Sequence, residues 1–86
     1  MIFGNKRSES EILSQILFSA ERDAKKTQLL YKANISYTHF NKYLEFLLEK
    51  DFIEAINKND LGKVYHITEK GQHFLKNIDN VLQQIR

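Results

Sequence analysis

The spacing of apolar residues changes twice along this chain, and this change restricts the fold more than any other feature. Up to about residue 50 the apolar residues recur every three or four positions, as on one face of a helix. Two short strand-like runs follow, at 52–56 and 64–67, with turn residues between them. From Thr68 onward the helical spacing returns. The sequence therefore predicts helices, then a β-hairpin, then a final helix.

Local signals mark where the first three helices begin and end. Ser8 and Glu11 have the spacing of a capping box, which predicts the start of the first helix. Thr27 is expected to cap a short second helix, and Asn34 suits the left-handed position that ends it. Ser36 is expected to cap the third helix, and Thr68 the last one. Two helices joined by so short a segment form a helix-turn-helix pattern.

The order of elements predicts a winged helix-turn-helix, a mainly α fold with a small β-hairpin. It would have a three-helix core, a two-stranded wing and a C-terminal helix. We expect a single winged-helix domain over 1–86, since a chain of 86 residues is too short for a second core. Within it we expect a flexible N-terminal arm at 1–7, the helix-turn-helix and wing at 8–67, and a dimerising helix at 68–86, whose apolar spacing resembles a coiled-coil seam.

Composition excludes several classes of protein. The absence of cysteine excludes disulfides, a cysteine nucleophile and a thiolate metal site. No apolar run approaches the roughly 20 residues that cross a bilayer, and the N-terminus lacks the pattern of a signal peptide. We therefore expect a cytoplasmic protein with no membrane partner.

The histidines do not suggest catalysis. His39, His66 and His73 fall on different predicted elements, and none has a partner at the spacing of a catalytic triad or a zinc motif. Glu69 and His73 are four residues apart and could share a metal, but an ordinary side-chain pair is the simpler interpretation. We expect no enzyme, metal, cofactor or small-molecule ligand.

The net charge of +2 is unevenly distributed. Residues 22–43 hold five basic side chains against one acidic, a net charge of +4. The flanking segments, 8–21 and 44–56, each carry −3. A basic centre between two acidic segments indicates where a polyanion would bind.

Three segments resemble small archaeal winged helix-turn-helix DNA-binding proteins, described as predicted transcriptional regulators. They are residues 26–36 for the second helix and turn, 42–53 for the third helix and first wing strand, and 65–75 for the second wing strand and last helix. The resemblance covers about Ile12 to Leu82. It implies DNA binding and a homodimer formed through the last helix. Asp51 departs from the family, which commonly has glycine there.

Candidate DNA contacts follow from the way a helix-turn-helix places the start of its second helix in the major groove. The candidates in that helix are Ser36, Thr38, His39, Asn41 and Lys42. At the start of the preceding helix, Lys25, Lys26 and Thr27 would hold a phosphate. Each of these residues could instead be an ordinary solvated side chain. Lys58 and Lys63 of the wing are further candidates, although a polar turn without a DNA role is the preferred interpretation there.

Phe18 and Phe46 lie almost opposite the apolar faces of their own predicted helices. Either the N-terminal segment covers one of them, or they mark a dimer surface. We favour dimerisation, in which Phe18 meets apolar residues of the last helix, namely Ile78, Val81, Leu82 and Ile85.

The sequence thus predicts a homodimeric regulator of transcription that binds double-stranded DNA. A two-fold dimer would present its recognition helices to half-sites about 34–36 Å apart, or a multiple of that distance. Two alternatives remain: an architectural protein that binds DNA without sequence preference, and a winged helix used only to bind another protein.

Overall fold

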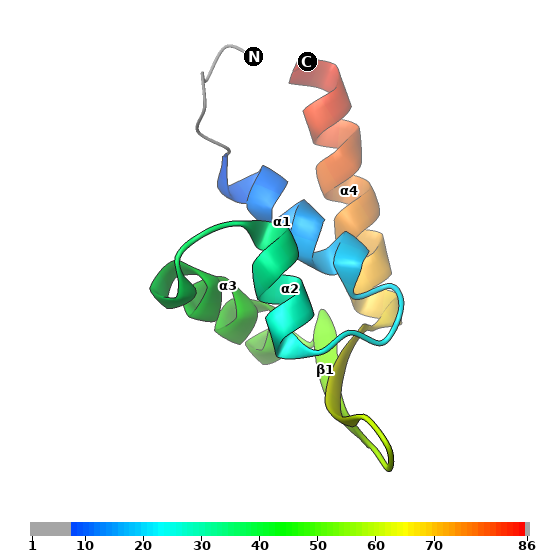
Figure 1. The fold of residues 1–86 in the computed structure, drawn as a ribbon. Helices are drawn as coiled ribbons and strands as arrows, with labels where there is room; N and C mark the ends of the chain where they lie inside the picture. Colours follow the sequence, from blue (N-terminus) through cyan, green and yellow to red (C-terminus); the bar gives the residue numbers. More distant parts are fainter. Residues whose placement is uncertain (1–7, 86) are drawn as a thin grey trace.

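The computed structural model describes residues 8–85, which form four helices and a two-stranded antiparallel sheet (Figure 1). The winged helix-turn-helix arrangement predicted from the sequence is confirmed. In chain order the elements are α1 (Glu9–Ser19), α2 (Lys26–Ala33), α3 (Tyr37–Glu49), β1 (Ile53–Lys58), β2 (Gly62–Ile67) and α4 (Glu69–Ile85). The expected flexible arm at 1–7 lies outside the described residues.

Three of the four predicted helix caps are confirmed. The hydroxyl of Ser8 accepts a hydrogen bond from the Glu11 N–H, and the Glu11 carboxylate accepts one from the Ser8 N–H, both at 3.2 Å. The Ser36 hydroxyl accepts from the His39 N–H at 3.2 Å. The Thr68 hydroxyl accepts from the N–H of Gly71 at 2.9 Å. Each cap satisfies a backbone donor that has no partner within its helix.

The expectation that Thr27 caps the second helix is wrong. Helix α2 starts two residues earlier, with Lys25 at the cap position and Thr27 inside the first turn. The Gln28 side chain accepts a hydrogen bond from the Lys25 N–H at 2.8 Å, so the cap is built from within the helix. At the other end Asn34 adopts the predicted left-handed conformation, with φ 53° and ψ 48°.

The wing is longer than the sequence predicted. Its register runs from Ile53 opposite Ile67 to Lys58 opposite Gly62, so part of the expected turn belongs to the strands. Gly62 has a φ of +75°, the left-handed conformation that closes a three-residue hairpin loop.

The segment between α1 and α2 is tied to the free edge of β2. Ala24 and Tyr65 exchange two backbone hydrogen bonds, of 3.1 and 2.7 Å. The Ile67 N–H also donates to the Ala20 carbonyl at 2.8 Å. These bonds fix the position of Asp23, the residue beside Ala24, against the wing.

The core is made of apolar residues from all four helices and the inner face of the wing. Helices α1 and α4 lie side by side, as Figure 1 shows. Ile78 and Leu82 of α4, which we expected at a dimer interface, are 8% and 5% exposed and belong to this core together with Ile12 and Ile16 of α1.

An aromatic cluster accounts for Phe46, one of the two phenylalanines that lie off the apolar faces of their helices. The ring of Phe46 meets Phe52 edge-on at 6.3 Å, and Phe52 stacks on Phe74 of α4 at 4.1 Å. Phe46 therefore has partners within its own chain. Phe18 remains 63% exposed.

None of the helices within residues 8–85 is long and apolar enough to span a membrane.

Candidate nucleic-acid interface

The first residues of α2 and α3 meet at the surface, and this meeting point is the centre of the candidate site. The ammonium of Lys26 lies 3.4 Å from the Tyr37 hydroxyl and 5.2 Å from the centre of its ring. The same ammonium group thus makes a hydrogen bond with the hydroxyl and a cation–π interaction with the ring. It brings the phosphate-binding candidates of α2 next to the base-reading candidates of α3.

Tyr37 is a functional candidate that the sequence reasoning missed. It lies three residues before the buried Phe40, so helical spacing places it towards the core. At the first position of α3, however, it extends beyond the core and is 58% exposed. The signal available in the sequence was its place directly after the Ser36 cap.

The environment of Tyr37 favours its ionised form. A hydrogen bond with Asn41, followed by the hydrogen bond and the charge of Lys26, holds the pKa of Tyr37 below its ordinary value. The hydroxyl oxygen is therefore surrounded by donors and positive charge.

Most of the predicted contact residues lie on the surface. The exposed ones are Lys25, Thr27, Ser36, Thr38, His39 and Lys42, while Lys26 and Asn41 are half-buried. Ser36 uses its hydroxyl as the cap of α3, and this bond leaves the hydroxyl proton available. Among the side-chain hydrogen bonds of the described residues, the α2 candidate that contacts α3 is Lys26.

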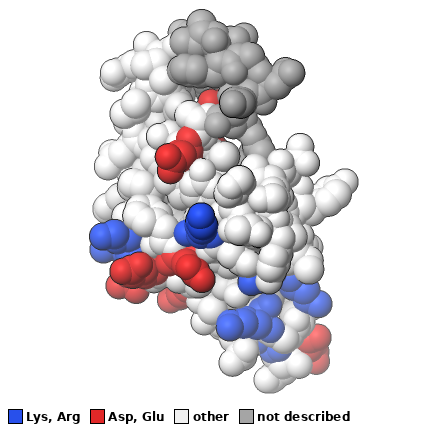
Figure 2. All heavy atoms as spheres, turned by 90° about the vertical axis from the view of Figure 1, so that its left-hand side faces the viewer, with Lys and Arg blue, Asp and Glu red and all other residues white. Residues whose placement is uncertain are grey.

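Charge divides α3 into two halves. No acidic residue occurs from Ala24 to Leu44, whereas Glu45 and Glu49 follow on the exposed surface of the second half. Figure 2 shows the face on which α3 lies: several basic side chains gather at its lower right, with an acidic group at their edge, and a band of acidic side chains lies farther to the left, with basic side chains beside it. Phosphates would be attracted to the first half of α3 and repelled by the second.

The two wing lysines differ in their surroundings. Asp23, another residue that the sequence reasoning missed, forms an ion pair of 3.1 Å with the Lys58 ammonium. Lys63 is exposed, and no ion pair to it is found among residues 8–85. Lys63 is thus accessible to a ligand, whereas the ion pair with Asp23 holds Lys58 against the body of the domain.

His66 completes this cluster. Its Nδ1 lies 3.1 Å from the second carboxylate oxygen of Asp23, but the two groups are not aligned for a hydrogen bond. Ion pairing and hydrogen bonding with Lys58, with a smaller contribution from His66, hold the pKa of Asp23 below its ordinary value.

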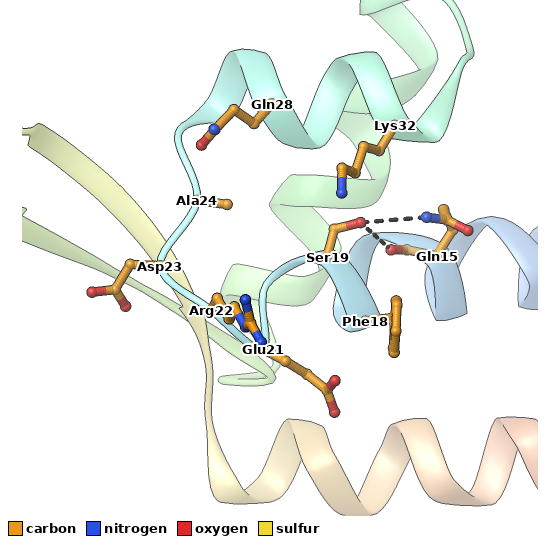
Figure 3. Close-up of a pocket in the computed structure, with 9 residues that line it drawn as sticks. All are labelled: Gln15, Phe18, Ser19, Glu21, Arg22, Asp23, Ala24, Gln28 and Lys32. Carbon is orange, nitrogen blue, oxygen red and sulfur yellow. Dashed lines mark hydrogen bonds between the residues drawn. The ribbon is translucent and has the colours of Figure 1, made fainter.

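A shallow groove of about 500 Å³ lies beside this region (Figure 3). Phe18 and Ser19 of α1 line one side, and Gln28 and Lys32 of α2 line the other. None of its lining residues comes from α3 or the wing, so the groove is separate from the candidate DNA contacts. Its walls carry charges of both signs, because Glu21 and Asp23 accompany Arg22 and Lys32.

The second half of α4 exposes apolar side chains. Val81 is 56% and Ile85 57% exposed, next to the buried stripe that holds Ile78 and Leu82. With Phe18, these two are the members of the predicted dimer surface that remain accessible on a single chain.

The structure assembles no metal site in the part of the chain that it describes. No group of three or more histidine and acidic side chains that could hold a metal ion occurs among residues 8–85. His39 lies on α3, His66 on β2 and His73 on α4, as the sequence predicted.

Comparisons with known proteins agree with this geometry. The model of the winged helix-turn-helix family matches residues 6–86. Sso10a-2, a DNA-binding protein from Sulfolobus solfataricus, has a solved structure that is similar, with a TM-score of 0.79 and 32% sequence identity. The match covers 90% of this chain and 80% of that one.

Two uncharacterized proteins of Methanocaldococcus jannaschii are also similar in sequence. One is 35% identical over 81 residues, which cover 93% of this chain and 36% of that protein. The other is 36% identical over 63 residues, covering 67% of this chain and 65% of that protein. The chain therefore spans between about a third and two thirds of the length of these curated relatives.

Lactococcus lactis ZitR, solved in complex with DNA, is a more distant structural match. Its TM-score is 0.66 at 20% identity, over 94% of this chain and 57% of that one. This likeness concerns the fold alone.

Proposed function

Because this chain belongs to the winged helix-turn-helix family, we propose that it binds double-stranded DNA as a homodimer and regulates transcription. The first half of α3 would lie in the major groove. The observation that carries the proposal is the contact of Lys26 with Tyr37, which joins the starts of α2 and α3 into one surface without acidic side chains.

Each part of this surface has a distinct role in the proposal. Lys25 and Lys26, beside the backbone N–H groups at the start of α2, neutralise phosphates and set the register on the duplex. Lys42 is a further phosphate contact on the exposed side of α3. Thr38, His39 and Asn41 face base edges, whose donors and acceptors match their short polar groups.

The acidic second half of α3 limits how the helix can approach DNA. Glu45 and Glu49 would be repelled by a phosphate backbone that ran along the whole helix. Entry by the N-terminal end keeps both carboxylates away from the groove. The DNA-binding description of Sso10a-2 supports the same general function for this chain.

The test is a titration of mixed-sequence duplex DNA followed by fluorescence anisotropy at several salt concentrations. For the wild type we expect log affinity to fall with log salt concentration, at a slope of about −0.9 per phosphate contact. Lys26→Glu and Lys42→Glu should weaken binding strongly and flatten the slope. Lys76→Glu, the same charge change at an exposed position of α4, is the matched control.

The outcomes separate the alternatives. Equal losses in all three variants would indicate a general effect of net charge and contradict the proposed site. Absence of binding at the lowest salt, even to a pool of random sequences, would overturn DNA binding and favour a protein-interaction module. Equal affinity for every sequence would indicate an architectural protein rather than a regulator of chosen sites.

A further inference from the structure

Resting on the proposed function, we propose that Tyr37 determines sequence specificity, donating its hydroxyl proton to an acceptor on a base edge and favouring guanine. Lys26 is the positioning residue that orients this hydroxyl.

The place of Tyr37 is that of a contact residue rather than a core residue. It is the first residue of α3, the end that enters the major groove in this family, and its side chain is 58% exposed. The ring is held from one side by the Lys26 ammonium, 5.2 Å from the ring centre. A tyrosine side chain has two χ angles, so it loses little conformational entropy when the Lys26 contact orients it.

The partners of the hydroxyl determine what it can offer to DNA. A lysine ammonium has donors and no acceptor, so Lys26 occupies a lone pair of the Tyr37 oxygen at 3.4 Å. Asn41, one helical turn further along α3, lowers the pKa of Tyr37 together with Lys26. With one lone pair engaged by Lys26, the hydroxyl can direct its proton to an acceptor on the DNA.

A hydroxyl that donates its proton discriminates between bases. In the major groove guanine presents two adjacent acceptors, N7 and O6, whereas cytosine presents a donor. Adenine presents one acceptor beside a donor, and thymine one acceptor beside a methyl group. Tyr37 should therefore favour guanine at the base pair that it faces and disfavour cytosine there.

The test is selection of binding sites from a random duplex library by the full chain and by Tyr37→Phe. This substitution removes the hydroxyl and keeps the ring, so folding should be preserved and is checked by urea unfolding. Tyr31→Phe, the same change at an exposed tyrosine of α2, is the control. The wild type and the control should select guanine at one position of each half-site, and Tyr37→Phe should lose that preference alone.

Atomic substitution in the DNA identifies the contact. Replacing the selected guanine by 7-deazaguanine removes the N7 acceptor and should weaken wild-type binding by about fivefold to tenfold, as expected for one lost base contact. The same DNA should bind Tyr37→Phe with unchanged affinity. Lys26→Met and Asn41→Ala should each raise the pKa of Tyr37, followed by NMR of a ring-labelled sample, since each removes a cause of its lowering.

Several results would overturn the inference. Selection of the same site by wild type and Tyr37→Phe would remove Tyr37 from base recognition. An equal loss of affinity for all sequences would make Tyr37 a phosphate contact. A wild type that binds DNA without base preference would refute this inference and leave DNA binding intact, whereas failure to bind any DNA would refute both.

Discussion

Asp23 lies between α1 and α2 and forms an ion pair with the wing, and its position has consequences for both stability and binding. Its carboxylate lies 3.1 Å from the Lys58 ammonium and 3.1 Å from Nδ1 of His66. The backbone bonds of the adjacent Ala24 to Tyr65 hold it there. While Asp23 is paired with Lys58, its carboxylate offsets the positive charge of the lysine and weakens the attraction of Lys58 for a phosphate.

The ion pair predicts a pH dependence. Because Lys58 lowers the pKa of Asp23 in the folded state below the ordinary value of 3.8, the pair stabilises the fold fully above that pH. The stabilisation is lost as the pH falls from 3.8 through the lower folded value. Urea unfolding should therefore show the wild type more stable than Asp23→Asn at pH 6, with the difference shrinking towards pH 2.

The control for this experiment is Asp60→Asn, at the exposed tip of the wing. It should behave like the wild type over the same pH range. A difference between wild type and Asp23→Asn that stays constant down to pH 2 would show that the carboxylate charge is not what stabilises the wing.

At the scale of elements, the junction of α3, β1 and α4 is the most constrained part of the fold. Asp51 takes a left-handed conformation, with φ 61°, which glycine adopts more readily than a residue with a side chain. Its carbonyl accepts a hydrogen bond of 2.6 Å from the Thr68 hydroxyl. The same hydroxyl caps α4 through Gly71, so one side chain links three elements.

Gly71 is the tightest point of this junction, and replacing it tests the packing. A Cβ on Gly71 would overlap the carbonyl oxygen of Phe52 and approach Ile67 Cγ1 to 2.9 Å. Alanine should favour the helix by about 0.8–1 kcal/mol over glycine. We expect Gly71→Ala nevertheless to destabilise the domain, because overpacking costs about 1–3 kcal/mol. The contact with the Phe52 carbonyl is severe, so the net loss should be about 1–2 kcal/mol after the gain in helix propensity is subtracted.

Thermal unfolding measures this effect, at roughly 4–8 °C for each kcal/mol in a domain of this size. Gln72→Ala, the next and exposed residue of α4, should change the melting temperature little. A melting temperature for Gly71→Ala at or above the wild-type value would mean that α4 can move away from Phe52.

At the scale of the whole molecule, the exposed apolar side of α4 is the surface that we propose a second copy of the chain covers. Ile78 and Leu82 are already buried against α1, so the proposed interface rests on Val81, Ile85 and Phe18. If two chains pair through it, two recognition helices are presented together, and both half-sites can be bound at once.

Charge placed on this surface should separate the chains. Val81→Glu should convert a dimer into a monomer in analytical ultracentrifugation, because an unpaired carboxylate would have to be buried. Its affinity for DNA with two half-sites should fall much more than its affinity for a single half-site. Gln83→Glu adds the same charge at an exposed polar position of α4 and should leave the dimer intact. If both variants and the wild type sediment as particles of the same mass, this surface is excluded as the interface.

The predictions that succeeded concern features that a few neighbouring residues determine. Helix starts at Ser8, Ser36 and Thr68 follow from side chains that reach backbone groups three residues away. Asn34 ends α2 because it tolerates the left-handed conformation. Thr27 failed as a cap because the helix begins two residues earlier, where the Gln28 side chain accepts a hydrogen bond from the Lys25 N–H.

The sequence by itself determined the order of helices and strands, the turn and the basic segment, since periodicity and capping act within a few residues. Only the tertiary structure decided which of these residues meet. Lys26 and Tyr37 are 11 residues apart, Asp23 and Lys58 are 35 apart, and the burial of Ile78 depends on α1 at the other end of the chain. Such contacts depend on how whole elements pack, and the spacing of residues within an element carries no record of the neighbour that it will meet.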